Sequence, residues 1–586
     1  AKELVRVDVP DSWKNAVGGD STQLNLENVD TDDPVRPKPI KDEPDFVKNI
    51  QRPMIRHEGD ELPVSTFIGM EDGTFPYGTT SYEKRGIAIT LPQWQTEKCI
   101  QCNQCSYICP HATIRPFLLD EEEMKNRPDT FETVEATGKG LEGLGYRIQI
   151  SPLDCTGCAN CADICPAPGK ALVMVDAAEE TIRQAENWEY AVNNVTYKDN
   201  LADKKTVKGS QFAMPLLEFS GACPGCGETA YIKLLTQLYG DRMMIANSTG
   251  CSSIWGASAP SIAYSTLPSG KGPSWANSLF EDNAEFGYGM ALASKQARSK
   301  IADLMEEGLE SDLDEDYKNL FRRWLTDKED GEKTREITEE LLQLIDSQNN
   351  AVHPIVKEIS EMRDHLVKKS IWIIGGDGWA YDIGYGGLDH VIASGEDINI
   401  LVMDTEVYSN TGGQASKATP TAAVAKFAAS GKKIRKKDLG LMAMTYGYVY
   451  VARVALGASM NHFIRAVIEA EAYKGPSLII CYAPCISHGI KTGMGTSVRQ
   501  QKRAVEAGYW YLYRFNPELK KQGKNPFMLD SKEPTESFRD YIHSEVRYSQ
   551  IMNVFPDLAD ELFNAAERDA RDTYEIYKRL AEMKYD

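Results

Sequence analysis

Residues 99–110 read CIQCNQCSYICP, and residues 155–166 repeat the same spacing as CTGCANCADICP. Each run has the form Cys-x2-Cys-x2-Cys-x3-Cys-Pro, so eight cysteines fall into two equal sets. Thiolates at these intervals can surround iron–sulfur clusters. The repetition predicts a small domain that is built around two such clusters.

The repeated run is the ligand pattern of two-cluster bacterial ferredoxins, in which the fourth cysteine of each run binds the other cluster. Structural zinc also uses Cys-x2-Cys pairs, but it explains neither the third cysteine nor the proline that follows the fourth. Short apolar segments at 112–119, 146–150 and 170–175 are expected to form strands that shield the clusters. We therefore predict one [4Fe–4S] cluster on Cys99, Cys102, Cys105 and Cys165, and a second on Cys109, Cys155, Cys158 and Cys161.

The composition is that of a globular protein with several domains. The chain has 586 residues, of which 42% are hydrophobic and 26% are charged. Its net charge of −21 disfavours nucleic acid as a partner, and no apolar run is long enough to span a membrane. Thirteen cysteines, mostly at metal-ligand intervals, favour a reducing compartment, which we take to be the cytoplasm.

The sequence divides into four regions. Residues 1–90 are rich in Asp, Pro and Lys and are expected to form an irregular segment that wraps the rest. The two-cluster α+β domain occupies 91–180, and a polar connector follows at 181–210. Residues 211–586 alternate short apolar runs with amphipathic helices, which predicts an α/β domain with a parallel sheet. An acidic stretch at about 300–365 is expected to be a helical insertion; residues 301–350 hold 16 acidic and 6 basic side chains.

Chemically distinctive residues follow the predicted strands of this last region. The strands are expected at 243–246, 371–374, 398–403 and 477–481. Cys251, Asp377, Asp404 with Thr405, and Cys485 follow them in that order. Because ligands bind beyond the carboxyl ends of parallel strands, we expect these residues to converge on one edge of the sheet.

The motif Gly376-Asp377-Gly378 follows the second of these strands, and the sequence DTEVYSNTGGQ at 404–414 follows the third. A Gly-Asp-Gly turn between a strand and a helix, with such a loop after the next strand, is the signature of thiamine diphosphate sites. Mg²⁺ prefers octahedral oxygen ligands and is usually shared between a few protein groups and phosphates. Asp377, the Thr405 hydroxyl and the Val407 carbonyl are suitable ligands. The alternative is an ordinary turn with a capping aspartate.

A third group of cysteines consists of Cys223 and Cys226 in CPGCG, Cys251, and either Cys481 or Cys485. Four such thiolates can hold a third [4Fe–4S] cluster, or zinc. We favour Cys485 as the fourth ligand, because Cys481 lies within an apolar strand, where a thiol usually packs as a small hydrophobe.

Taken together, these motifs resemble the pyruvate:ferredoxin oxidoreductase family. The resemblance rests on the two cysteine runs, CPGCG, GDGWAYDIGYGG, DTEVYSNTGGQ, YAPCISHG and the SYEKRG stretch at 81–86. It covers nearly the whole chain and implies the C-terminal half of such an enzyme. The chain is accordingly expected to be a fragment of a longer protein.

The resemblance implies roles for individual residues. It places a third cluster on Cys223, Cys226, Cys251 and Cys485, and Asn410 at the substrate as a catalytic residue. The residues expected to bind thiamine diphosphate and Mg²⁺ are Gly376, Asp377, Gly378, Thr405, Val407, Asn410, Thr411, Gly412 and Gly413.

The implied reaction is the oxidative decarboxylation of pyruvate with coenzyme A to acetyl-CoA. Electrons would pass through three [4Fe–4S] clusters to ferredoxin or flavodoxin. The implied partners include the N-terminal half, and the whole enzyme is expected to be a homodimer. Two alternatives stay open: another 2-oxoacid, such as indolepyruvate, 2-oxoglutarate or oxalate, or an electron relay without catalysis.

Two further features have simpler interpretations. We expect His488, beside Cys485, to be a hydrogen-bonded loop residue rather than a proton donor. The basic run at 432–437 could attract an acidic ferredoxin, but a solvated helix face is the interpretation we prefer.

Overall fold

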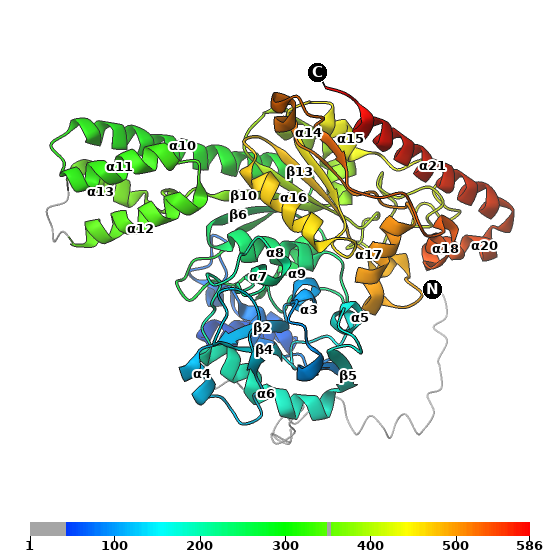
Figure 1. The fold of residues 1–586 in the computed structure, drawn as a ribbon, viewed down its shortest axis with the longest axis horizontal. Helices are drawn as coiled ribbons and strands as arrows, with labels where there is room; N and C mark the ends of the chain where they lie inside the picture. Colours follow the sequence, from blue (N-terminus) through cyan, green and yellow to red (C-terminus); the bar gives the residue numbers. More distant parts are fainter. Residues whose placement is uncertain (1–42, 348–352, 586) are drawn as a thin grey trace.

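The computed structural model describes residues 43–347 and 353–585 (Figure 1). A small domain that contains the two cysteine runs packs against a larger α/β domain, and an arm of helices extends from the larger one (Figure 1). This arrangement confirms the predicted fold class. The expectation that residues 1–42 are irregular lies outside the described residues.

The small domain contains two antiparallel sheets. Its strands 112–119, 146–150 and 170–175 were predicted to within about two residues, and the edge strand at 90–94 was not predicted. The sheets pair β1 (Thr90–Trp94) with β5 (Leu172–Asp176), and β4 (Gly145–Ile150) with both β2 (Ile114–Leu119) and β3 (Val134–Glu135). Two short helices, α3 (Gln104–Ile108) and α5 (Asn160–Ile164), follow the first two cysteines of each run.

The region expected to be a connector begins instead as a helix of the small domain. α6 (Ala177–Asn194) lies along this domain and buries Trp188 together with the polar side chains of Gln184 and Asn187. The Gln184 side chain accepts a hydrogen bond from Arg147 at 3.0 Å. The polar composition was misleading here, because these side chains form buried hydrogen bonds rather than facing solvent.

The large domain is organised around an eight-stranded sheet. In spatial order the sheet runs β15 (Phe527–Leu529), β14 (Tyr513–Phe515), β12 (Tyr450–Val454), β13 (Ser477–Tyr482), β11 (Asn399–Asp404), β10 (Ser370–Gly376), β6 (Met243–Ser248) and β9 (Ser274–Ser278). The six strands from β12 to β9 in this order are parallel, and β14 and β15 extend the sheet beyond β12 in antiparallel fashion. The four predicted strands are β6, β10, β11 and β13, and they are consecutive neighbours.

The two faces of this sheet bury alternate residues of each strand, as pleated strands require. Ile373 and Val402 point into the core on one face. Trp372 and Met403 point into the core on the other face, which is continuous with the core of the small domain. Helices α8 (Thr229–Tyr239) and α16 (Met460–Ala472) contribute to this shared core. The sheet and the cluster domain are therefore joined by continuous apolar packing.

The acidic insertion forms the arm on the left of Figure 1. Its first helix, α10 (Asn283–Glu310), begins on the sheet, where Gly287 allows close approach: a Cβ there would lie 2.4 Å from Ile373 Cγ1. The other half of α10 packs with α11 (Glu315–Asp327), α12 (Gly331–Ser347) and α13 (Pro354–Glu361) around a separate core that includes Trp324 and Phe321. The arm thus begins within a helix that also covers the sheet.

The described part of the N-terminal segment joins the two domains. It is irregular, with short helical turns such as Thr79–Tyr82. Thr80 donates a hydrogen bond to the Glu218 carbonyl at 3.0 Å, and Lys84 forms an ion pair with Asp154 at 2.7 Å. Asp154 directly precedes Cys155, so this segment connects the large domain to the second cysteine run.

At the other end of the described chain, α21 (Pro556–Glu582) packs beside β15 at the right of Figure 1. None of the helices in the described ranges has the length and apolar character that crossing a membrane requires.

Candidate functional site

The first group of cysteines surrounds a cavity in the small domain. It is lined by Cys99, Cys102, Cys105 and Cys165, and Trp94, Ile148 and Leu172 form apolar walls. Burial raises the pKa of the Cys105 thiol well above its usual range, and the neighbouring cysteines raise it further. The fold thus brings together three cysteines of the first run and the last one of the second run.

The second group surrounds a similar cavity, which is lined by Cys109, Cys155, Cys158 and Cys161. The two runs share one backbone conformation, with left-handed residues at Gln101 and Asn103 in the first and at Gly157 and Ala159 in the second. At Gly157 a side chain is also excluded sterically, because a Cβ would lie 2.9 Å from the Thr90 carbonyl oxygen. These left-handed turns curl each run around its cavity.

The way in which the two runs share their cysteines bears on the choice between clusters and zinc. Each cavity is lined by the first three cysteines of one run and the fourth cysteine of the other. This exchange of the fourth cysteine is the arrangement of two-cluster ferredoxins. A structural zinc site gives no reason for it.

The third group lies at the carboxyl end of the large sheet. Cys251 opens α9 (Cys251–Gly256) after β6, and Cys485 follows β13. Burial raises the pKa of the Cys226 and Cys251 thiols, and the nearby Glu228 adds to the shift. Cys485 acts on both thiols in the same direction, and Cys223 acts on Cys251. Close contact of Gly227 with Pro484, where a Cβ would meet the Pro484 nitrogen at 2.6 Å, brings the two loops together.

Cys481 does not belong to this group. Its side chain is fully buried within β13, in the core shared with the small domain. Burial raises the pKa of the Cys481 thiol, and its charged neighbour is Asp404 rather than another cysteine. Of the two candidates for the fourth ligand, the structure places Cys485 beside the others.

The predicted magnesium ligands meet at the ends of β10 and β11. Thr405 Oγ1 lies 3.0 Å from Asp377 Oδ1 and 3.0 Å from the Val407 carbonyl oxygen. Adjacent ligands of an octahedral Mg²⁺ with bonds of 2.0–2.1 Å stand about 2.8–3.0 Å apart. Thr405 Oγ1 therefore lies at the separation of adjacent octahedral ligands from each of the other two oxygens.

The electrostatics of this site also suit a cation. Burial raises the pKa of Asp377 well above its usual range, and the nearby Asp404 carboxylate adds to the effect. A bound divalent cation would stabilise the ionised form that burial disfavours. Ser416, which sequence reasoning missed, donates a hydrogen bond to Asp377 Oδ2 at 2.6 Å. The only signal for it was its position two residues after the TGGQ sequence.

The glycine-rich loop after β11 forms a tight turn at the surface of the described chain. Tyr408 and Gln414 pair across it, and Gly412 and Gly413 adopt positive φ angles of 107° and 89°. Asn410 and Thr411 are exposed there and lie outside the Asp377–Thr405 contacts. The Tyr408 ring packs against Gly378, where a Cβ would lie 2.4 Å away. The fold therefore places this loop above the Gly-Asp-Gly turn but does not bring Asn410 to the metal ligands.

The third cysteine group and this loop are in direct contact. Cys251 Sγ lies 3.2 Å from Ser409 Oγ, next to Asn410. The predicted cluster site and the predicted cofactor site thus share the carboxyl edge of one sheet, as the strand order implied.

A buried network of charges stabilises the polypeptide beneath the magnesium ligands. Lys436 Nζ lies 2.7 Å from Asp404 Oδ2 and 3.0 Å from Glu406 Oε1, and Arg547 pairs with Glu406 at 2.8 Å. Burial opposes ionisation of Glu406, but Lys436 and Arg547 outweigh it and lower its pKa to about 2. The basic run at 432–437 is not helical, contrary to our expectation. Its middle residues, 433–435, are exposed, whereas Lys436 points inward to Asp404 and Glu406.

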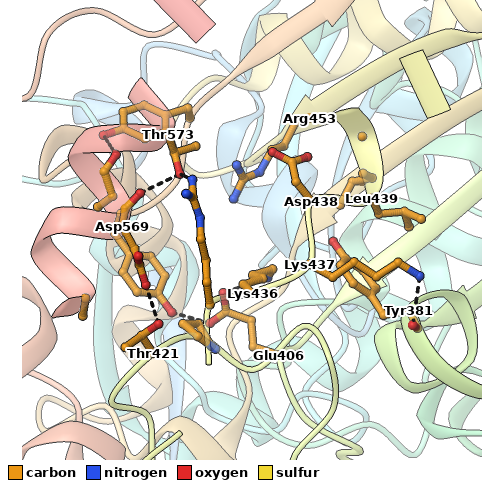
Figure 2. Close-up of a pocket in the computed structure, with 18 of the residues that line it drawn as sticks. Tyr381, Glu406, Thr421, Lys436, Lys437, Asp438, Leu439, Arg453, Asp569 and Thr573 are labelled. Carbon is orange, nitrogen blue, oxygen red and sulfur yellow. Dashed lines mark hydrogen bonds and ion pairs between the residues drawn. The ribbon is translucent and has the colours of Figure 1, made fainter. Parts of the chain in front are cut away.

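Figure 2 shows a separate cavity on the far side of this network. Glu406, Lys436 and Arg453 line it, together with Asp569 and Thr573 of α21. Among the described residues that line it, none is a predicted magnesium ligand. We therefore do not assign the cofactor to this cavity.

His488 joins the cluster loop to the metal-ligand loop. Its Nε2 lies 2.7 Å from the Thr405 carbonyl oxygen, and the side chain is fully buried. Burial and, to a smaller extent, the nearby Arg547 lower the pKa of His488 to about 4. It is therefore a neutral hydrogen-bond donor to the carbonyl of a predicted metal ligand, which agrees with our expectation of a hydrogen-bonded loop residue.

This pKa predicts acid sensitivity. The unfolded chain binds a proton at His488 below pH 6.5, whereas the folded protein does so only near pH 4, so stability is lost as pH falls through that interval. Between about pH 7.5 and pH 5 the loss from this group is about 2 kcal/mol. Denaturant unfolding of wild type and His488→Gln at both pH values measures it, because Gln keeps a donor but does not titrate. An equal acid-induced loss in both proteins would contradict the prediction.

Comparisons with known proteins agree with this arrangement. A family described as a 4Fe-4S dicluster domain matches residues 98–168, and one described as the C-terminal TPP binding domain of thiamine pyrophosphate enzymes matches residues 362–481. A third family (EKR), described as a domain of unknown function, matches residues 33–88.

Several curated proteins are similar over most of the chain. It is 57% identical over 547 residues to pyruvate:ferredoxin oxidoreductase from Moorella thermoacetica, covering 93% of this chain and 46% of that protein. It is also 57% identical over 538 residues to pyruvate-flavodoxin oxidoreductase from Klebsiella pneumoniae, covering 92% and 46%. The chain spans about half the length of these relatives.

Proposed function

Because the chain belongs to the family of pyruvate:ferredoxin and pyruvate-flavodoxin oxidoreductases, as the C-terminal half of such an enzyme, we propose that it contributes the thiamine diphosphate site and the electron path of pyruvate oxidation. In the proposed reaction pyruvate and coenzyme A give acetyl-CoA, carbon dioxide and a proton, and two electrons leave singly for ferredoxin or flavodoxin. Twelve cysteines would hold three [4Fe–4S] clusters.

The chain's own residues have defined parts in this proposal. Asp377, Thr405 and the Val407 carbonyl hold Mg²⁺, and Ser416 orients the Asp377 carboxylate through its hydrogen bond. Gly412 and Gly413 let the loop approach the cofactor, and Asn410 faces the substrate. When bound, thiamine diphosphate supplies the electron sink for loss of carbon dioxide from the keto acid. Cys223, Cys226, Cys251 and Cys485 hold the cluster nearest that site.

One observation is the main support for the proposal. The 3.2 Å contact between Cys251 Sγ and Ser409 Oγ joins a cluster ligand to the loop that would cover the cofactor. A one-electron carrier at this point could accept electrons without an intermediate carrier. A pure relay would need no such contact and no intact Asp377–Thr405–Val407 arrangement.

Analysis of the full-length protein tests this function. We expect bound thiamine diphosphate and magnesium, iron and sulfide for three clusters, and reduction of ferredoxin or flavodoxin that requires both pyruvate and coenzyme A. Turnover on 2-oxoglutarate, indolepyruvate and oxalate should be much weaker. A protein with iron but no thiamine would be a relay, and preference for another keto acid would correct the substrate. The cytoplasmic location and the homodimeric state of the whole enzyme are parts of the same proposal.

A further inference from the structure

Lys233 is a buried lysine that the proposed function does not use. It lies on α8, seven residues after Cys226, and is 2% exposed. Burying a charged ammonium group is costly unless strong partners compensate. Its surroundings should therefore show what the charge stabilises.

The ammonium group of Lys233 points into the small domain, at the segment between the two cysteine runs. It donates hydrogen bonds to the Ser106 carbonyl oxygen and, at 3.3 Å, to the Cys109 carbonyl oxygen. Within the part of the chain that the structure describes, no carboxylate lies within 4.0 Å of it. The nearby cation Arg115, by contrast, is paired with Glu218.

The contacts of Lys233 relate it to the second ferredoxin-type cluster site. Of the two residues whose carbonyl oxygens it contacts, Cys109 is a predicted ligand of that site and Ser106 is not a predicted ligand. Burial lowers the pKa of Lys233 to about 8, while the nearby Cys109 raises it, so most of the side chain is an ammonium group at pH 7. The buried positive charge therefore lies beside the site of Cys109.

We propose that the buried positive charge of Lys233, which no carboxylate pairs with among the described residues, raises the reduction potential of one cluster. That cluster is the one held by Cys109, Cys155, Cys158 and Cys161. This inference rests on the proposed function, since it requires that site to hold a [4Fe–4S] cluster. Adding an electron makes an anionic cluster more negative, and a buried cation beside it stabilises the reduced form. Water and salt screen such an interaction poorly in the interior.

The consequence is an ordered path for the electron. The second cysteine run lies beside the third cysteine group, because Ser497 accepts a hydrogen bond from Asn160 at 3.0 Å and donates one at 2.8 Å to the Gly225 carbonyl oxygen, between Cys223 and Cys226. A raised potential at the Cys109 site would draw electrons away from the cofactor edge. Nothing in the sequence signals this, because Lys233 and Ser106 are 127 residues apart.

Redox titration of the holoenzyme, followed by electron paramagnetic resonance, tests the proposal. Lys233→Met removes the charge, Lys233→Gln keeps a donor without charge, and Lys233→Arg keeps the charge. At a fixed ambient potential, we expect the Met and Gln variants to lower the ratio of reduced to oxidised cluster at the Cys109 site at least tenfold. For a one-electron couple this corresponds to a decrease in the reduction potential of at least about 59 mV. The Arg variant should stay close to wild type.

Lys198→Met is the matched control, because Lys198 lies on the same domain but is paired with Glu123 at 2.6 Å. If wild type shows the cluster signals but neither neutral variant has a shifted potential, the inference about Lys233 is wrong and the proposed function still stands. Wild-type protein without [4Fe–4S] signals would overturn the proposed function instead.

A second measurement applies if both neutral variants fail to assemble. Electron–nuclear double resonance of reduced protein labelled with ¹⁵N-lysine should show a ¹⁵N coupling to the Cys109-site cluster that is missing from Lys233→Arg. Identical spectra from the two proteins would overturn the proposal.

Discussion

The Asp377→Asn variant of the full-length enzyme is expected to lose at least about 1,000-fold of its pyruvate oxidation while keeping all of its iron. Asp377 is the only anionic side chain among the three proposed magnesium ligands. A metal ion's electrostatic contribution is several kcal/mol, and about 4 kcal/mol corresponds to three tenfold steps in rate. Thiamine retained after gel filtration and the rate of ferredoxin reduction measure the loss.

This loss should not reflect unfolding. Burial and Asp404 disfavour the charged form of Asp377 in the absence of metal, so a neutral amide of the same shape suits the fold. Asn can also keep partners for Thr405 and Ser416. Asp389→Asn is the matched control, since Asp389 accepts a hydrogen bond from Tyr446 at 2.8 Å on the surface of α14 (Tyr385–Ala393). Full thiamine binding and activity in Asp377→Asn would show that the site is elsewhere.

The Cys251→Ser variant is expected to bind thiamine diphosphate normally, to lose about a third of its iron, and to reduce ferredoxin only at background rate. Clusters of this kind are held by thiolates, which serine does not supply, and the cluster that would be lost is the one we propose beside the cofactor. Iron analysis, thiamine analysis and the ferredoxin assay on one preparation separate these effects.

Two further cysteine variants make this result specific. Cys485→Ser should behave as Cys251→Ser does, whereas Cys481→Ala should keep its iron and lose only stability, by at most a few kcal/mol from the cavity it leaves in the core. Loss of a cluster from Cys481→Ala, with normal iron in Cys485→Ser, would reverse the assignment of the fourth ligand.

Much of the site could be predicted from sequence because its residues occupy fixed positions relative to strands. Cys251, Asp377, Thr405 and Cys485 each follow an apolar strand, and parallel strands place their carboxyl ends together. The two cysteine runs were equally informative, because their spacing reflects the shape of the group they surround.

Other features depend on contacts that no local pattern reveals. Ser416 meets Asp377 across 39 residues, and Lys436 enters the interior because Asp404 and Glu406 are buried there. β12 lies outside β13 in the sheet although it precedes it in sequence. α6 was missed because its buried face is polar, with Gln184 and Asn187 hydrogen-bonded inside the small domain.

The central claim is that a [4Fe–4S] cluster and a magnesium-held thiamine diphosphate share one edge of the large sheet. A crystal structure of the holoenzyme, with anomalous data collected at the iron absorption edge, tests it most directly. We expect three separate iron peaks, one of them enclosed by Cys223, Cys226, Cys251 and Cys485 beside a cofactor on Asp377. A single zinc between those cysteines, or a cofactor remote from Asp377, would contradict it.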